Sequence, residues 1–457
     1  MREFLDFLKE KDDIIYIAEE VDPEWEINGF TRTMCQKQGP ALYFQKIKGM
    51  NYPMVAGMLA SDKRYLWALG LEEEKDLNRT WGEMTRELIP PVIVKKAPCQ
   101  EEIFKPEDID LDKICNVKWH EQDGGPYPGT ISISVTKDYD AGAQNAGIYR
   151  MATLGKNRLS WGAAPYSHGQ QHLNQYEKQG KPMPLAIVTG VDPISEIVGA
   201  TRTAPGIDEF YLAGALRGEP LEVVKCKTID INVPATAEWV FEGYVYPGVR
   251  ELDRNFGEVT SYYGEAHRQP VFEIKMITHR KSPIYQGTRE QWYPSESTIT
   301  CGKSSQGDAF KILKGIVPGL LDMKCDVTFQ AIVKIDKLFK GHPQQVMDAI
   351  WGATYARYKH VIVVDKDIDI WDYDSLQWAL STRVKADRDV TINSRRAGGH
   401  RDPSSPTRER GYESTMGIDA TMKNEKYEFW GEPVPTTVDD LQTVERFKKK
   451  WGKKLNL

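Results

Sequence analysis

The stretch QNAGIYRMATL, residues 144–154, places two polar side chains five residues apart among small and apolar neighbours. Successive side chains of a β-strand point to opposite faces, so strict alternation would send Asn145 and Arg150 to opposite faces of a sheet. Gly147 lies between them and could host a β-bulge that brings both side chains to one side. An amide and a guanidinium in such a strand need polar partners, because burying either one alone is costly.

The residues just before this stretch predict a β-hairpin. In TISISVTKDYDAGA, residues 130–143, the side chains of Ile131, Ile133 and Val135 alternate with polar ones, as in a half-buried strand. A turn is expected at residues 140–142, where Asp, Ala and Gly follow one another. Strand patterns dominate from about residue 99 to 315, which indicates a mostly antiparallel sheet.

Two helices are expected within this strand-rich region. The first, SHGQQHLNQYEKQGKP, begins at Ser167 as its N-cap and ends before Gly180 and Pro182. The second, IDEFYLAGALRGEP, is closed by Gly218 and Pro220.

Beyond about residue 316, strands and helices alternate. The strand QAIVKI, a helix over 343–358, the strand HVIVVD and the helix DSLQWALSTRV form a βαβ pattern, which indicates a parallel sheet. Prolines 90, 91 and 98 punctuate an earlier boundary. We therefore predict a mixed α/β (α+β) fold with three domains, over residues 1–98, 99–315 and 316–457. The basic tail VERFKKKWGKK, after Asp439 and Asp440, predicts a C-terminal helix.

Composition bounds the class of protein. A chain of 457 residues is long enough for two or three domains, and its net charge of -6 gives no basic footprint for nucleic acid or anionic lipid. The six cysteines form no C-x-x-C pair, and no apolar stretch approaches the length that spans a bilayer. These features predict a soluble cytoplasmic protein that acts on a small molecule.

Three familiar motifs are incomplete here. CGKSS contains the Gly-Lys-Ser of a phosphate loop, but Ser297 stands where the first glycine of that loop is required. His168 and His172 have the spacing of zinc ligands on a helix, yet Gly169 occupies the position of the general-base Glu of a zinc protease. His172 is expected to be a surface residue or an indirect support of the site. No G-x-G-x-x-G links a strand to a helix, so an ordinary dinucleotide-binding domain has no support.

Several polar residues remain in apolar or glycine-rich settings. Burying the charge of a lone Arg or Glu costs on the order of several kcal/mol of folding free energy. These residues are therefore expected either to stay exposed or to pair with one another in a site. They are Asn145, Arg150, His168, Glu209, Asp253 and Glu258.

Longer segments carry a resemblance to a known family. They are DGGPYPGTISIS, NAGIYRM, YSHG, DEFYLAGALRGEPLEVVKCKTIDINVPATAEWVFEG, NFGEVTSYYGE, GHPQQVMDAIWG and MGIDAT, in this order along nearly the whole chain. In this combination the chain resembles the UbiD family of decarboxylases that use prenylated FMN. The resemblance implies an N-terminal α/β domain, a split β-barrel flavin-binding domain and a C-terminal α/β domain that mediates oligomerisation, as a dimer or hexamer.

The resemblance also implies a cofactor site. Asn145, His168 and Glu209 would hold a divalent metal, Mn²⁺ or Mg²⁺, which grips the cofactor phosphate, and K⁺ would accompany it. An amide oxygen, an imidazole and a carboxylate suit such an ion. Residues expected to contact the cofactor are Asn145, Ile148, Tyr149, Arg150, Met151, Ser167, His168, Gly169 and Glu209.

Arg150, Asp253 and Glu258 match the family's catalytic acid-arginine-acid set. Many members carry Glu at the position of Asp253, so this chain has a side chain that is one methylene shorter. The implied reaction is reversible, non-oxidative decarboxylation of an aromatic, heteroaromatic or α,β-unsaturated carboxylic acid, with Arg150 on the carboxylate and Glu258 as proton donor. Alternatives are a carboxylase-direction subunit of a larger complex and a non-catalytic cofactor-binding subunit. A flavin prenyltransferase would supply the cofactor.

Overall fold

The structure, a computed structural model, describes residues 1–325, 329–354, 357–397, 402–405, 412–423 and 441–455. Its internal contacts define two compact units. One consists mainly of Met1–Lys311, and the other mainly of Ile312–Cys325, Phe329–Gly399 and Thr407–Leu457. The predicted boundary between residues 98 and 99 stays a prediction, because the first unit runs through it.

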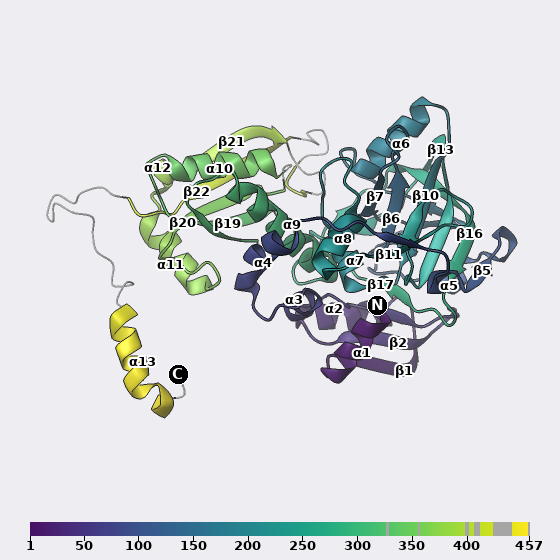
Figure 1. Cartoon of the computed structure of the whole chain (residues 1–457), viewed down its shortest axis with the longest axis horizontal. Coiled ribbons are helices and arrows are strands. Elements are labelled where there is room, and N and C mark those ends of the chain that lie inside the picture. Colours follow the sequence, from purple (N-terminus) through teal and green to yellow (C-terminus); the bar gives the residue numbers. More distant parts are fainter. Residues whose placement is uncertain (326–328, 355–356, 398–401, 406–411, 424–440, 456–457) are drawn as a thin grey trace. The chain divides into compact units, whose positions relative to one another are not determined.

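The first unit begins with a four-stranded sheet (Figure 1). Its strand order is β1 (Ile14–Val21), β2 (Ala41–Ile47), β3 (Met54–Ala56) and β17 (Tyr285–Gly287). Helices α1 (Arg2–Glu10) and α2 (Glu26–Gln36) contact β1 and β2, respectively. Its last strand comes from a segment more than 200 residues away in sequence, so the N-terminal residues do not complete this sheet alone.

A larger antiparallel sheet forms the centre of the first unit. Its order is β7 (Gln144–Ile148), β6 (Ile133–Lys137), β10 (Met183–Thr189), β13 (Trp239–Leu252), β16 (Arg268–His279), β9 (Arg158–Ser160) and β8 (Thr153–Gly155), with β5 (Glu102–Phe104) also paired to β16. Alternation explains how the sheet buries both faces. On β10, Leu185 and Ile187 belong to one apolar cluster, whereas Ala186 and Val188 belong to another.

The predicted hairpin is confirmed as β6 and β7. Over the described residues 133–148 their pairing runs without a shift, from Ile133 opposite Ile148 to Lys137 opposite Gln144. The bulge considered at Gly147 is therefore absent from this pairing. The strand instead ends at Ile148, and Arg150 lies beyond it in an isolated bridge with Gly162.

Both predicted helices are confirmed, with their caps. Ser167 accepts a hydrogen bond from the backbone of Gln170 and starts α6 (His168–Lys178). Asp208 caps α8 (Glu209–Arg217), which ends at Gly218 in the left-handed conformation, where glycine is favoured. Figure 1 shows α8 beside α7 (Pro193–Gly199) and strand β7, and both helices contact that strand.

This region contains further helices that the sequence did not predict. They are the four-residue α5 (Leu111–Ile114), α7 and the 19-residue α9 (Glu296–Lys314). The first half of α9 is polar and rich in Ser and Thr, residues with modest helix propensity. CGKSS lies inside α9, so it forms no phosphate loop. The remaining helices and strands of this unit are α3 (Asp62–Ala68), α4 (Leu77–Met84), β4 (Val92–Val94), β11 (Glu222–Lys225), β12 (Asn232–Pro234), β14 (Phe256–Gly257) and β15 (Tyr263–Gly264).

The second unit contains a five-stranded sheet. Its order is β18 (Leu320–Lys324), β19 (Gln330–Ile335), β20 (His360–Asp365), β22 (Tyr412–Asp419) and β21 (Val390–Ala397). Strands β19 and β20 are parallel, and α10 (His342–Ala353) connects them along the chain, which confirms the predicted βαβ unit. This helix ends five residues before the expected 358. The other helices are α11 (Tyr373–Arg383), α12 (Ala386–Asp389) and α13 (Leu441–Leu455).

The C-terminal tail forms the expected helix in α13, but Asp439 and Asp440 lie outside the described residues. Among the described helices, none is both long enough and apolar enough to cross a membrane. All six cysteines are free thiols. The two units together form the predicted mixed α/β (α+β) fold.

Candidate active site

The amide and imidazole of the candidate metal site come from neighbouring elements. Asn145 lies in β7, and His168 is the first residue of α6. The Tyr149 hydroxyl joins these two segments: it lies 3.5 Å from the Asn145 side-chain amide nitrogen and accepts a hydrogen bond from the Gly169 backbone at 3.3 Å. The strand carrying Asn145 thus lies against the start of the helix carrying His168.

Glu209 reaches the same strand from α8. Its carboxylate accepts a hydrogen bond from the backbone N–H of Ala146 at 2.6 Å and another from the Thr203 hydroxyl at 2.7 Å. The three predicted metal-binding residues therefore lie on segments that contact one another around β7. Sequence reasoning missed Thr203, because a threonine in a connecting loop carries no signal of its own.

Burial sets the charge of this group. It raises the pKa of the Glu209 carboxyl to about 8, and no Lys or Arg in the described chain forms an ion pair with it. Burial, aided by the charge of Arg202, lowers the pKa of His168 and so favours the neutral imidazole. A buried carboxylate without a cationic partner, an amide oxygen and a neutral imidazole fit a hard divalent cation.

The residue types of this set are unusual for a metal site. Among the described residues, no three His, Cys, Asp or Glu side chains group as a metal centre. The predicted set contains only two side chains of those types, His168 and Glu209, and its third member is an amide.

His172 is buried, so the expectation of a surface position was wrong and only the supporting role remains. Its Nδ1 lies 2.9 Å from the Thr136 hydroxyl, and its Nε2 lies 3.7 Å from the Asp138 carboxylate. Burial, opposed by Asp138, lowers the pKa of His172 to about 4. Thr136 pairs across the hairpin with Asn145, so His172 supports the strand behind the site.

Arg150 lies between the two predicted catalytic acids. Its Nη1 contacts the Glu258 carboxylate, and its Nε lies 3.5 Å from the Asp253 carboxylate. Burial acts to lower the pKa of Arg150, but the negative charges of Glu258 and Asp253 outweigh it, so the net shift is upward. The structure therefore joins three residues that are separated by up to 108 positions in the sequence.

The two acids differ in exposure. The Asp253 side chain is 0% exposed, whereas the Glu258 side chain is 12% exposed. The Ser160 hydroxyl donates to Asp253 at 2.8 Å and accepts from the backbone of Ala152 at 3.0 Å. Sequence reasoning missed Ser160, since a serine in a three-residue strand gives no sign of what it binds.

Two glycines allow close packing around this ion pair. A Cβ atom on Gly264 would lie 3.2 Å from Glu258 Oε1 and 3.4 Å from Arg150 Nη1. A Cβ atom on Gly162 would lie 3.0 Å from Arg150 Cγ. Any larger residue at these positions would push the guanidinium or the carboxylate.

The other residues predicted to contact a cofactor occupy varied positions. Met151 is fully buried in the core, and its backbone N–H and carbonyl form hydrogen bonds with Gly129. Ile148 is partly buried, and Ser167 caps α6.

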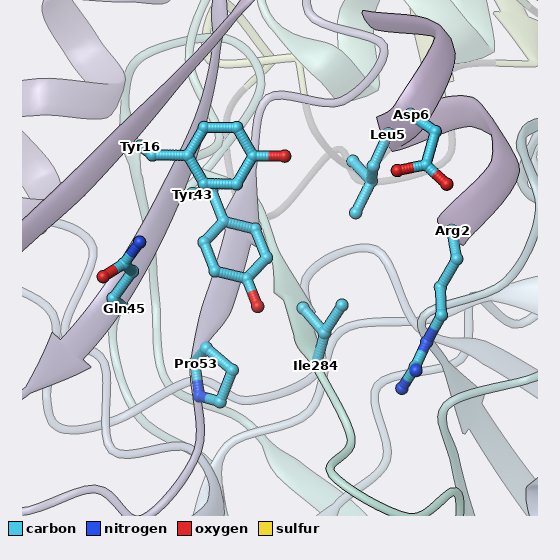
Figure 2. Close-up of a pocket in the computed structure, with 8 residues that line it drawn as sticks. All are labelled: Arg2, Leu5, Asp6, Tyr16, Tyr43, Gln45, Pro53 and Ile284. Carbon is cyan, nitrogen blue, oxygen red and sulfur yellow. The ribbon is translucent and has the colours of Figure 1, made fainter. Parts of the chain in front are cut away.

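Two cavities lie apart from Arg150 and its acids. One of about 470 Å³ lies between α1 and strands β1 and β2, and Figure 2 shows Tyr16 and Tyr43 on one side of it and Asp6 and Arg2 on the other. None of its lining residues was predicted. The other, of about 430 Å³, includes Gln144 and Asp208, the sequence neighbours of Asn145 and Glu209.

Comparison with known families identifies the class of protein. The family models of 3-octaprenyl-4-hydroxybenzoate carboxy-lyase match three successive segments: the N-terminal domain over residues 5–83, the Rift-related domain over 92–291 and the C-terminal domain over 307–420. The chain is thus an enzyme of the carboxy-lyase class. It belongs to the UbiD family, as the sequence motifs predicted.

Solved structures of the family resemble it over their full length. The UbiD-class enzyme HmfF from Pelotomaculum thermopropionicum, in complex with FMN, is 31% identical, with a TM-score of 0.84 and coverage of 98% of this chain and 99% of that one. An evolved dimeric form of HmfF is in complex with prFMN and is 30% identical, with a TM-score of 0.83 and the same coverage.

Two further relatives match equally broadly. Vanillic acid decarboxylase from Sedimentibacter hydroxybenzoicus, in its closed form, is 29% identical, with a TM-score of 0.88 and coverage of 98% of each chain. The uncharacterised protein sll0936 from Synechocystis is 30% identical over 99% of this chain and 95% of its own length.

Proposed function

We propose that the protein catalyses reversible, non-oxidative decarboxylation of an aromatic, heteroaromatic or α,β-unsaturated carboxylic acid with prenylated FMN. The observation that carries this proposal is the pairing of Arg150 with Asp253 and Glu258. A guanidinium can bind a carboxylate through two parallel hydrogen bonds, which a lysine cannot reproduce. Arg150 therefore holds the substrate carboxylate and keeps it oriented.

The difference in exposure supports different roles for the two acids. Glu258 is partly exposed beside Arg150, so its carboxyl can meet a substrate and deliver a proton to the carbon that loses CO₂. Asp253 is enclosed and hydrogen-bonded to Ser160, so it acts by balancing the charge of Arg150. This division supports Glu258 as the proton donor.

Side chains alone cannot stabilise the carbanion left by CO₂, and prenylated FMN supplies the required electron sink when bound. The backbone of residues 148–151 and the start of α6, Ser167 to Gly169, would contact the cofactor. Backbone N–H groups at the N-terminus of a helix favour a phosphate. Asn145, His168 and Glu209 would hold Mn²⁺ or Mg²⁺ next to that phosphate, with K⁺ nearby, and the buried Glu209 carboxyl, which forms no ion pair with a Lys or Arg among the described residues, supports a cation there.

The partners follow from this chemistry. The substrate is a small carboxylic acid, and a flavin prenyltransferase supplies the cofactor. We further propose a cytoplasmic homo-oligomer, a dimer or hexamer; the dimeric form of HmfF supports the dimer.

The first test is the identity of the chromophore. The protein should be co-expressed with a flavin prenyltransferase, purified with Mn²⁺ and K⁺, and examined by absorption spectroscopy and mass spectrometry. Stoichiometric prenylated flavin is expected. A colourless protein or plain FMN would contradict the proposal.

The second test addresses the proton donor. Loaded enzyme should release CO₂ from members of a panel of such acids, and Glu258→Gln should abolish turnover while the flavin stays bound. Glu251→Gln is the matched control, because Glu251 pairs with Arg158 at the surface. Persistent turnover in Glu258→Gln would eliminate Glu258 as the donor, and inactivity towards the whole panel would count against decarboxylation.

A further inference from the structure

Glu258 lies at the tip of a short hairpin. Strand β14 ends at Gly257, directly before Glu258, and Gly257 pairs with Tyr263 of β15. The Glu258 N–H donates to the Tyr262 carbonyl at 2.9 Å, and the Ser261 N–H donates to the Glu258 carbonyl at 2.8 Å. The position of the Glu258 carboxyl thus depends on where this hairpin is held.

A buried carboxylate anchors the hairpin. Asp123 is 4% exposed, and its Oδ1 accepts a hydrogen bond from the Gly257 N–H at 2.9 Å. Its Oδ2 accepts from the backbone N–H of His120 at 2.9 Å and also faces the His120 ring Nδ1 at 3.2 Å. Both oxygens of Asp123 are therefore engaged, and one of them is bonded to the residue before Glu258.

The His120 ring is held on two sides. Its Nε2 lies 2.7 Å from the Glu290 backbone carbonyl, which can only accept, so Nε2 carries a hydrogen. Its Nδ1 lies 3.2 Å from the Asp123 oxygen that also accepts the His120 backbone N–H. The ring is therefore fixed between the Glu290 carbonyl and the Asp123 side chain.

The imidazole ring also supports the hairpin by packing. A Cβ atom on Gly257 would lie 2.5 Å from His120 Nδ1, so the backbone at this glycine lies directly on the ring. Phe256 of β14 and Tyr263 of β15 meet the same ring edge-on, with centroids at 6.2 and 6.0 Å. His120 thus contacts both strands of the hairpin.

We propose that His120 and Asp123 are positioning residues, a buried, hydrogen-bonded pair that holds the β14–β15 hairpin so that Glu258 meets Arg150. The pair does not touch the reacting atoms; it acts through the backbone of Gly257. This inference rests on the proposed role of Glu258 as proton donor. Its consequence is that loss of the pair lowers kcat while substrate binding through Arg150 persists.

Amide hydrogen exchange tests the positioning without cofactor or substrate. In Asp123→Ala and His120→Ala, the peptide covering residues 256–264 should exchange faster than in the wild type, because the Gly257 N–H loses its acceptor or its support. Asp123→Asn keeps an oxygen for that N–H, so its exchange should lie close to that of the wild type. Glu121→Ala, an exposed acid in the same loop, is the matched control.

Kinetics of the loaded enzyme complete the test. A misplacement of about 1 Å can cost on the order of 100-fold in rate, so kcat of Asp123→Ala should fall by about 10- to 100-fold with KM within about twofold. Flavin content should stay unchanged, and Asp123→Asn should recover most of the rate. If Asp123→Ala is poorly folded, His120→Asn provides the same comparison.

The outcomes separate this inference from the proposed function. Wild-type exchange in the hairpin, or wild-type kcat in both alanine variants, would overturn the positioning role. Failure of the proposed function would instead appear as a loaded wild-type enzyme that releases no CO₂, with the exchange difference still present.

Discussion

Replacing Glu196 with glutamine is expected to reduce the loss of stability that the wild-type protein undergoes as the pH rises. Glu196 in α7 and Glu296 at the start of α9 are both 0% exposed. Each accepts one short hydrogen bond, from the Gln286 amide and the Leu59 N–H respectively, both at 2.6 Å. Within the described chain, Glu196 Oε1 and Glu296 Oε2 have no hydrogen-bond partner.

Burial, reinforced by the charge of Glu296, raises the pKa of Glu196 well above its ordinary value of 4.5, and burial also raises the pKa of Glu296. The folded protein therefore keeps a proton on this pair at pH values where the unfolded chain has lost it. A raised pKa contributes stability below the unfolded value, near pH 4.5, which is lost as the pH rises towards the folded value.

The magnitude follows from one retained proton. Each pH unit in this window costs about 1.4 kcal/mol of stability. A glutamine at position 196 stays neutral, can accept from Gln286 and can donate to Glu296. The variant should therefore avoid about 1.4 kcal/mol of this loss for each pH unit inside the window.

Thermal unfolding of wild type and Glu196→Gln, followed by fluorescence from pH 5.5 to 8.5, measures this difference. Other buried acids, such as Glu209, titrate in both proteins and cancel in the comparison. Glu222→Gln, an exposed acid of β11, is the control and should match the wild type at every pH. Parallel pH profiles for wild type and Glu196→Gln, or a lower Tm of the variant at pH 8, would refute the reasoning.

Glu209→Gln should lose the rise in Tm that Mn²⁺ gives the wild type in a thermal-shift titration, because the carboxylate charge that attracts the cation is gone; an unchanged rise would move the metal elsewhere. Ser160→Ala leaves an oxygen of Asp253 buried without a donor, so Tm should fall by an amount equivalent to about 1–3 kcal/mol. Gly264→Ala crowds Glu258 against Arg150, so kcat should fall at unchanged flavin content, and wild-type kcat would show that the carboxylate can shift freely.

Local features of the fold were predictable because their causes are local. The cap at Ser167 and the left-handed Gly218 fix the ends of α6 and α8 through contacts within one turn. The alternation in residues 131–135 predicted strand β6 for the same reason. By contrast, α9 lacks a strong sequence signal, and its stability comes from packing, in which buried residues such as Ile299 and Leu313 take part.

The candidate site was only partly predictable. Composition and spacing marked Arg150, Asp253 and Glu258 as polar residues that need partners, but pairing over more than 100 positions depends on the topology of the sheet. Family motifs supplied that grouping. Ser160 and Asp123 carried no such signal in the sequence. Their hydrogen-bond partners are backbone N–H groups and, for Ser160, also the Asp253 carboxylate, and sequence spacing does not identify such partners.

The position of Arg150 relative to Asn145 follows from where β7 stops. Pairing with β6 ends at Ile148, so Arg150 is released from the strand and its backbone pairs instead with Gly162. Asn145 stays within the sheet, next to Ala146, whose backbone N–H donates to the Glu209 carboxylate. The Arg150 side chain instead contacts Asp253 and Glu258. Asn145 and Arg150 thus lie in chemically different surroundings without a bulge, because the chain leaves the sheet between these two residues.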